Sequence, residues 1–356
     1  MMCTIPAVRE LVIIISDLYL PHAEQRDASS VVMPGLEHAS RFAERSGLTV
    51  GWRPWLARWI GGEDVADLAP ATIAAAAIAS RQGDAPGARA AASATVWMAT
   101  PVHLLASLTS LHLDRRSVLR LSAAECTTLA CEFERLFHDS GFVLEPLDSG
   151  EFLLFGPPLP QVDTSEPARA MGESVAERLP GGAGAAALRG LGAEIEMWLH
   201  EHAVNDARIR QGQPAITALW LWGGGAAEAS VPHPDGGART GIAFGSDAYL
   251  RGLWIKMGGN ARSLPNQLAE IFSYPSAQRA VLVLDVGQML HSNPRWTVLE
   301  AVACIDGRFI APAVQALHQA ALERLQILAN DVRLSLRARD RLKFWRRAAP
   351  GLSGLL

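Results

Sequence analysis

The chain has 356 residues, enough for one large domain or two modest ones, and a formal net charge of −4 at pH 7. Hydrophobic residues make up 49% and charged residues 19%, a composition that argues against disordered and nucleic-acid-coating chains. The four cysteines form no C-x-x-C pair, and no apolar run approaches the roughly 20 residues of a transmembrane helix or the pattern of a signal peptide. We therefore expect a cytoplasmic protein with no membrane partner and no disulfide or zinc framework.

The first predicted strand covers residues 11–15, a continuous β-branched run that is typical of a strand covered on both faces. Asp17 follows directly, at the carboxyl tip of this strand. Pro34 then opens a helical pattern over residues 36–45, which Gly47 closes. The chain therefore begins like a β-α-β unit with a carboxylate at the end of a central parallel strand.

Residues 96–160 predict a small inserted β-β-α-β-β domain. Ser122 and Glu125 form a capping box that opens a helix to about residue 138, and the turn signal Asp148-Ser149-Gly150 separates two apolar runs as in a hairpin. The stretch 161–189 is rich in Pro, Gly, Ala and Ser and predicts a linker. The main domain is then expected to comprise residues 1–95 and 190–356.

Strands alternate with helices in the second half of the main domain, which predicts an α/β fold. We expect a three-layer sandwich with a mostly parallel central sheet. The expected elements are a helix over 193–210, a strand over 216–222 that stops at Gly223, Gly224 and Gly225, a helix over 246–257, a strand over 280–284 before Asp285, and a helix over 296–329.

Three of these strand ends carry residues that could bind a ligand or a metal ion. Ligands of open α/β sheets gather outside the carboxyl ends of the strands, where Asp17, the three glycines and Asp285 are predicted to lie. His291 follows Asp285 by six residues, and carboxylate and imidazole are common ligands of divalent ions. Asp17, Asp285 and His291 are therefore candidate metal ligands. The alternative is that both aspartates cap the helices that follow them.

A second candidate site combines the glycines with the preceding helix. Glycine-rich strand exits can hold a phosphate through backbone N–H groups, and Asn205 and Arg208 lie three residues apart on one helical face. These five residues are candidate phosphate ligands, although a turn after a buried strand also favours glycine. Ser246 lacks the G-x-S-x-G context of a nucleophile and is expected to cap a helix.

The segment His202-Ala-Val-Asn205-Asp-Ala-Arg208, with the strand and glycines after it, resembles the pattern H-P-V-N-x-x-R-x-x-x-G of the cofactor-independent phosphoglycerate mutases. These enzymes form the archaeal-type branch within the alkaline phosphatase superfamily. The chain also resembles bacterial phosphoglycerate-mutase-like and Rpf-type regulatory proteins. Ser16-Asp17 and Asp285-x5-His291 are similar to the family's metal-ligand segments, and residues 299–306 are similar to its I-E-x-I-D helix.

The resemblance also implies residues that this sequence lacks. Residues 52–62 contain no serine to serve as the family's nucleophile, Asp331 is not followed by histidine, and no histidine follows His318. Asp17, Asp285, His291 and Asp331 are the metal ligands that remain, whereas a two-metal phosphoryl-transfer site relies on several more. The resemblance therefore implies an alkaline-phosphatase-like fold with a degenerate metal and phosphate site.

From these observations we expect a binding or regulatory protein, a pseudoenzyme whose partner is a small phosphorylated ligand or a protein. The implied cofactor is Mn²⁺ or Mg²⁺, with a metal-free protein as the alternative. One competing function is an active single-metal phosphoesterase. Another is a scaffold whose basic segment, between Arg333 and Arg347, binds nucleic acid or an acidic protein. A short charged segment of this kind is more often a solvated edge strand.

Overall fold

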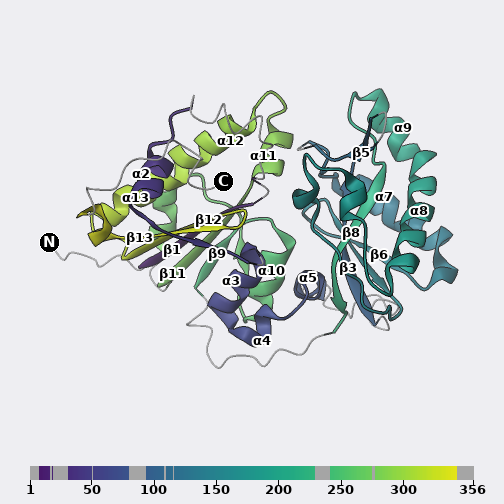
Figure 1. Cartoon of the computed structure of the whole chain (residues 1–356), viewed down its shortest axis with the longest axis horizontal. Coiled ribbons are helices and arrows are strands. Elements are labelled where there is room, and N and C mark those ends of the chain that lie inside the picture. Colours follow the sequence, from purple (N-terminus) through teal and green to yellow (C-terminus); the bar gives the residue numbers. More distant parts are fainter. Residues whose placement is uncertain are drawn as a thin grey trace. The chain divides into compact units, whose positions relative to one another are not determined.

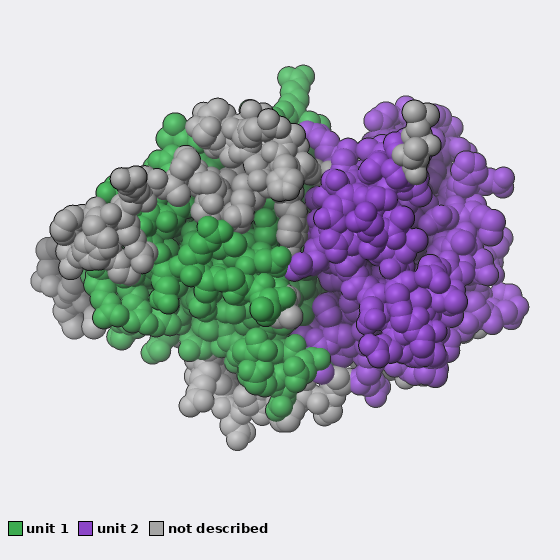
Figure 2. Space-filling view, viewed as in Figure 1, with its two compact units in different colours: residues 1–67, 232–356 green, residues 68–231 purple. Residues whose placement is uncertain are grey.

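The computed structural model describes residues 8–16, 18, 31–49, 51–79, 94–107, 110–114, 116–228, 241–274 and 277–342. The chain divides into two compact units, coloured separately in Figure 2. Unit 1 comprises Met1–Asp67 and Pro232–Leu356, and unit 2 comprises Leu68–Val231. Unit 2 is therefore a contiguous insertion in unit 1. Within the described residues, no helix is long and apolar enough to cross a membrane.

Unit 1 contains a seven-stranded sheet in the order β10-β9-β11-β1-β12-β13-β2. The first five strands of this order are mutually parallel, and β13 pairs antiparallel with both β12 and β2. The predicted α/β fold with a mostly parallel central sheet is thus confirmed. The strand bounds are β1 (Glu10–Ser16), β2 (Glu44–Gly47), β9 (Ile242–Phe244), β10 (Ala261–Arg262), β11 (Arg279–Asp285), β12 (Arg324–Ala329) and β13 (Val332–Arg337).

Helices cover both faces of this sheet (Figure 1). One face is covered by α2 (Pro34–Phe42), α11 (Val286–Ser292), α12 (Val298–Ile305), the π-helix η6 (Asp306–Ile310) and α13 (Ala311–His318). The other face is covered by α3 (Trp52–Gly61) and α10 (Ala248–Lys256), and α4 (Glu63–Ala66) packs against α3. The 3-10 helices η5 (Leu268–Ser273) and η7 (Ala338–Leu342) complete the described part of unit 1.

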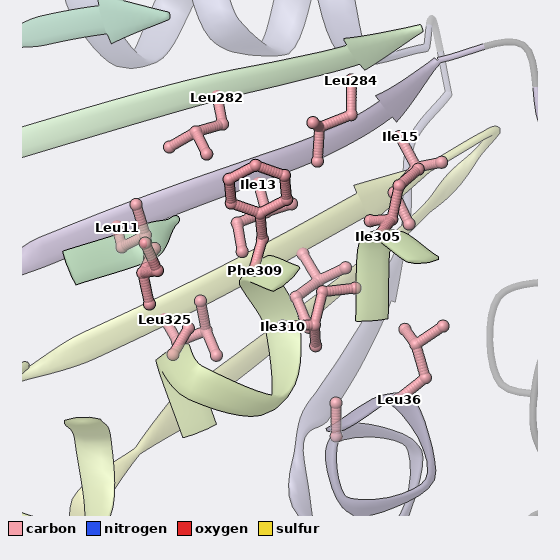
Figure 3. Close-up of a cluster of buried hydrophobic side chains, with 14 of the residues drawn as sticks. Leu11, Ile13, Ile15, Leu36, Leu282, Leu284, Ile305, Phe309, Ile310 and Leu325 are labelled. Atoms are coloured by element: carbon pink, nitrogen blue, oxygen red, sulfur yellow. The ribbon is translucent and has the colours of Figure 1, made fainter. Parts of the chain in front are cut away.

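The central strand β1 organises the core of unit 1. Leu11, Ile13 and Ile15 point to the face covered by α2, α12 and α13, where they pack with Leu36 and Phe309 (Figure 3). The intervening residues of β1 are also fully buried, because helices cover the opposite face as well. Covering both faces explains why this strand is continuously apolar rather than alternating.

Asp306 anchors α2 to the helical layer. Its side chain, at the start of η6, accepts hydrogen bonds from the backbone N–H groups of Gly35 (3.1 Å) and Leu36 (2.7 Å). These N–H groups have no partner within the helix, so the carboxylate completes the hydrogen bonding of its first turn. Burial raises the pKa of Asp306, although the two N–H donors oppose the shift. A buried carboxylate thus replaces the side-chain cap that Met33 cannot supply.

Unit 2 contains an antiparallel sheet in the order β6-β7-β3-β8. Its elements are β3 (Thr95–Val102), β6 (Val143–Pro146), β7 (Phe152–Gly156), β8 (Ala218–Ala226), the small pair β4 (Leu105–Ala106) and β5 (Leu111–His112), and the helices α5 (Pro70–Ala79), α7 (Ala123–Leu136), α8 (Ala185–His200) and α9 (Ala203–Arg210). Short 3-10 turns are η2 (His138–Ser140), η3 (Pro167–Ala170) and η4 (Val175–Arg178). Helices α7 and α8 pack against one face of the sheet.

The strand with the glycines lies elsewhere than the sequence predicts. β8 belongs to the four-stranded sheet of unit 2, so the prediction that it ends at the same sheet edge as β1 and β11 is wrong. The units also divide the chain at 67/68 and 231/232, whereas the sequence boundaries were expected at 95/96 and 189/190. Composition alone marks the Pro- and Gly-rich stretch over 161–189. It does not show which sheet the following strand joins, because that depends on pairing with residues far away in the sequence.

The predicted helix over 296–329 is wrong beyond residue 318. Helix α13 ends at His318, Ala320 has a positive φ of 58°, and Arg324–Ala329 forms the inner strand β12. A buried apolar run reads equally as helix or strand, and the breaker here is an alanine in a left-handed conformation. Strand β13 is likewise not an edge strand, because β2 pairs with its outer side. Residues 343–347 of the basic segment lie outside the described residues.

Several local predictions are confirmed. Ser122 and Glu125 form the capping box of α7, with both reciprocal hydrogen bonds present. Strands β6 and β7 form the predicted hairpin around residues 148–150. The expected helix over 193–210 is instead two helices, because His202 caps a new one through its Nδ1.

Replacing Gly224 with alanine is expected to destabilise the protein by about 1–3 kcal/mol, the usual cost of overpacking. A Cβ at this position would overlap the Trp97 ring, which is buried in unit 2. Gly190 in α8 is the matched control, since its Cβ would meet no atom and alanine is the better helix former, by about 1 kcal/mol. Urea unfolding measures both variants, and equal stabilities would contradict the packing assigned to Gly224.

Acidification is expected to reduce the stability of the protein through His38. Burial, His318 at the end of α13 and Arg41 all lower the pKa of His38 below its ordinary value of 6.5. The unfolded chain then binds a proton that the folded chain does not, so stability present above pH 6.5 is lost as the pH falls towards the folded pKa. Urea unfolding at a series of pH values should show a weaker acid loss for His38→Gln than for wild type. An unchanged pH dependence would contradict this assignment.

Candidate functional site

Two strand ends meet at the predicted edge of the seven-stranded sheet. Ser16, the last residue of β1, is paired in register with Asp285, the last residue of β11. Ser16 is buried, and its Oγ lies 3.5 Å from the carbonyl oxygen of Leu284. Asp17, the first candidate metal ligand, lies outside the described residues. The register nevertheless aligns the residue before it with the second candidate ligand.

Asp285 caps the short helix α11. Its Oδ1 accepts a hydrogen bond from the backbone N–H of Gln288, with an N···O distance of 2.9 Å. The Gln288 side chain extends the arrangement to the next strand exit, because its Oε1 accepts a 2.8 Å hydrogen bond from Ser246. A polar link therefore connects the exits of β9 and β11. Capping by Asp285 matches the structural alternative weighed from the sequence, and it leaves the predicted metal role as a prediction.

The exit of β9 also carries a charged pair. Asp247, rather than the predicted Ser246, caps α10 by accepting a 2.9 Å hydrogen bond from the N–H of Leu250. Its Oδ2 lies 3.4 Å from a guanidinium nitrogen of Arg53. Arg53 in turn stacks over Trp52, with 4.5 Å between its Cζ and the ring centroid. The carboxylate here serves the packing of α3 against α10.

His291 stands in the last turn of α11. Its Nδ1 lies 3.1 Å from the carbonyl oxygen of Gly287, which can only accept, so Nδ1 is the donor and carries a proton. Metal-binding histidines show this pattern, because donation to a backbone carbonyl directs the Nε2 lone pair towards the ion. Within the described ranges, however, no group of three or more His, Cys, Asp or Glu side chains is close enough to hold a metal.

Asn205 holds the start of β8 in place. Its Nδ2 donates to the carbonyl oxygens of Leu199 (2.7 Å) and Ile216 (2.8 Å), and its Oδ1 accepts from the N–H of Ile216 (2.7 Å). The residue is buried, and both amide hydrogens are used. These contacts favour a structural role, and the predicted phosphate contact of Asn205 stays a prediction.

Arg208 ties α9 to the start of α7. Its Nη1 lies 2.7 Å from Oε1 of Glu125, and its Nε donates to the carbonyl oxygen of Pro214 (2.8 Å). Burial acts to raise the pKa of Glu125, but hydrogen bonds from Ser122 and Arg208 outweigh it and lower the pKa. The ion pair is thus a buried, hydrogen-bonded connection between two helices. As with Asn205, this favours a structural role over the predicted anion contact.

The three glycines lie within β8 and allow close packing. Gly223 has a positive φ of 62°, and its N–H donates to Thr164. A Cβ on Gly224 would overlap Trp97, and one on Gly225 would overlap Ala69 next to α5. The pairing of β8 with β3 is irregular at this point, opposite Trp97. The glycines therefore accommodate an indole ring and a helix, and their predicted phosphate role stays a prediction.

The structure assigns the candidate residues to different compact units. Asp285 and His291 belong to unit 1, whereas Asn205, Arg208 and the glycines belong to unit 2. Sequence reasoning did not find the link from Ser246 through Gln288, because no motif marks a glutamine in the first turn of a helix. Asp306 was noted in the mutase-like segment, but its contact with α2 follows from the fold.

The solved structures that match the chain include two that are distant from it in sequence. No family model and no curated protein matches the sequence. A cofactor-independent phosphoglycerate mutase from Thermoplasma acidophilum has 13% identity and a TM-score of 0.41, covering 92% of this chain and 89% of that one. The PH0037 protein of Pyrococcus horikoshii has 12% identity and a TM-score of 0.49, covering 93% and 88%.

Replacing Asn205 with alanine is expected to destabilise the protein by about 2 kcal/mol or more, since each buried polar group left without a partner costs about 1–3 kcal/mol. The N–H and the carbonyl of Ile216 would lose their partner, whereas the carbonyl of Leu199 would still accept from the N–H of His202. Asn293→Ala is the control, because that side chain makes one 3.2 Å hydrogen bond to Met289. Similar losses in the two variants, measured by urea unfolding, would contradict the role assigned to Asn205.

Proposed function

We propose that this chain is a phosphoglycerate-mutase-like binding or regulatory protein, which holds a small phosphorylated ligand at the carboxyl edge of its seven-stranded sheet. The observation that carries the proposal is the register of Ser16 with Asp285, which aligns the exits of two parallel strands at the edge where ligands of α/β sheets bind. The polar link between Ser246 and Gln288 adds a third strand exit to the same edge.

The contacts of the polar residues support binding over mutase chemistry. Asp285 and Asp247 each cap a helix, and Asn205 and Arg208 hold secondary-structure elements together. A phosphoglycerate mutase instead needs side chains that approach metal ions and the transferred phosphoryl group. The residues that most resemble the mutase pattern make structural contacts in this protein. This supports a function in binding rather than in mutase catalysis.

A divalent ion remains part of this proposal. Asp285 supplies carboxylate oxygen and His291 supplies an imidazole with its Nδ1 bonded to a carbonyl, donors that suit Mn²⁺. When bound, the ion would add positive charge for a phosphate group. The two described residues are fewer than a complete ligand set, so further ligands would come from water, the phosphate or Asp17.

One competing function is a single-metal phosphoesterase that hydrolyses small phosphate esters and would use the same Asp285 and His291 as metal ligands. The two functions differ in turnover. A binding protein is stabilised by Mn²⁺ and phosphate but releases no phosphate from p-nitrophenyl phosphate, whereas an esterase releases it in proportion to Mn²⁺ occupancy.

Asp285→Asn is expected to remove stabilisation by Mn²⁺ while leaving the metal-free protein nearly as stable as wild type. Asparagine caps a helix about as well as aspartate but lacks its charge. In wild type, Mn²⁺ at 100 times its dissociation constant should stabilise the fold by about 2.7 kcal/mol, measured as a thermal shift with inorganic phosphate present.

Asp247→Asn is the matched control, because Asp247 also caps a helix at a strand exit of the same sheet. It is expected to keep the Mn²⁺ shift. The same shift in Asp285→Asn, or no shift in wild type at millimolar Mn²⁺, would overturn the metal site. Steady release of phosphate by wild type would replace the binding function with the esterase.

A further inference from the structure

The outer edge of β8 has backbone groups that point away from the sheet. β8 is the last strand of its sheet and pairs with β3. Leu219 faces Pro101, which has no N–H and whose carbonyl accepts from Leu119 instead. In an antiparallel ladder, the two residues of a non-hydrogen-bonded pair point their N–H and C=O groups away from each other. The N–H and C=O of Leu219 therefore point away from β3. The backbone N–H and C=O of Leu221, two residues further along the strand, point to the same side. The N–H of Gly223 donates to Thr164 on this side.

A cavity of about 180 Å³ lies along this edge. The four consecutive residues Ala218–Leu221 line it, so it follows the strand rather than one face of the sheet. Its walls come from α8 on one side and from the segment around η4 on the other, with apolar contributions from Leu104, Val175, Leu179, Leu188 and Trp220. The result is an apolar groove between an edge strand and a helix, named here the β8–α8 groove.

One glycine creates the space on the helix side. Leu188, Gly192 and Glu196 are four residues apart in α8, so they form one stripe, and all three line the groove. A Cβ on Gly192 would meet no atom within 4 Å. The groove is therefore open where a larger side chain would fit without a clash, and its depth depends on this residue.

Two arginines and one glutamate line the groove, and they differ in the partners that they have within the chain. Arg178 has an ion pair with Glu173, with 2.6 Å between Nη2 and Oε2, and Arg189 donates to the carbonyl oxygen of Pro180. Burial raises the pKa of Glu196, and no residue in the described part of the chain forms an ion pair or hydrogen bond with its carboxylate. A carboxylate that is partly desolvated gains from an opposite charge supplied by a ligand.

We propose that the β8–α8 groove binds an extended peptide segment of a partner protein as an additional strand. The peptide would hydrogen bond to Leu219 and Leu221, place an apolar side chain between Leu188 and Trp220, and place a lysine or arginine beside Glu196. Backbone pairing to a sheet edge supplies affinity in such complexes, and side-chain pockets supply specificity. The proposal goes beyond the function of unit 1, because every residue of the groove belongs to unit 2.

The test uses the full chain and an array of blocked pentapeptides, acetyl-Thr-X-Val-Z-Thr-amide, in which X and Z each sample all residues except cysteine. We expect selection of lysine or arginine at one position and of leucine, isoleucine or valine at the other. The best peptide, labelled with fluorescein, is then titrated by anisotropy. N-methylation of its central amide should abolish binding, because a strand added to β8 needs that N–H.

Gly192→Leu is the decisive variant and Gly190→Leu is its matched control. Both positions lie in α8 and both would accept a Cβ without contact, but Gly190 does not line the groove. Gly192→Leu should weaken peptide binding at least about tenfold, since the leucine occupies the space of the apolar side chain, whereas Gly190→Leu should leave binding unchanged. Thermal melting verifies that both variants are folded.

Glu196→Gln provides a second test that changes no volume. It should weaken the cationic peptide by about two- to fivefold, the range for a partly exposed ion pair, and leave the peptide with alanine in place of the basic residue unaffected. An array without selection, equal binding by the two glycine variants, or binding that survives N-methylation would overturn the proposal. The Mn²⁺ experiment on Asp285 reports on unit 1 and is independent of these outcomes.

Discussion

The burial of β1 on both faces is the constraint on which the rest of unit 1 depends. Its apolar residues remove surface from water on two sides, so both helical layers must be present. Its two neighbours come from the far end of the chain, as the 314 positions between Glu10 and Arg324 illustrate. Because those pairings are in register, the strand exits are aligned, and any chemistry of the sheet edge follows from this packing.

Elements that depend on interactions between residues close in the sequence could be predicted from short sequence patterns. The β-branched run of β1, the capping box at Ser122 and the hairpin around residue 149 each carry their own signature. The sheet membership of β8 carries none, since an apolar strand followed by glycines fits a parallel or an antiparallel sheet. The sequence predicts a helix over Arg324–Ala329 because the residue that ends the helical run, Ala320, usually continues helices.

The sequence predicts where the candidate site residue Asp285 lies better than it predicts what its side chain does. Asp285 was correctly placed at a strand exit, and its capping of α11 was one of two readings that the sequence left open. Residue type could not decide between them, because a carboxylate suits a helix N-terminus and a cation equally. The motif from His202 to Arg208 shows the same ambiguity, since polar residues that can contact a ligand also satisfy buried backbone groups.

The insertion of unit 2 within unit 1 has a consequence for how the molecule is made. Unit 2 is contiguous in sequence, so all of its contacts are available once residue 231 has left the ribosome. β1 must wait for β11 and β12, both of which are synthesised later. Domains generally fold as they emerge, and non-local parallel pairing is slow. The apolar strand β1 is therefore synthesised before both of its sheet neighbours and cannot be fully buried until they have emerged, which prolongs its exposure to aggregation.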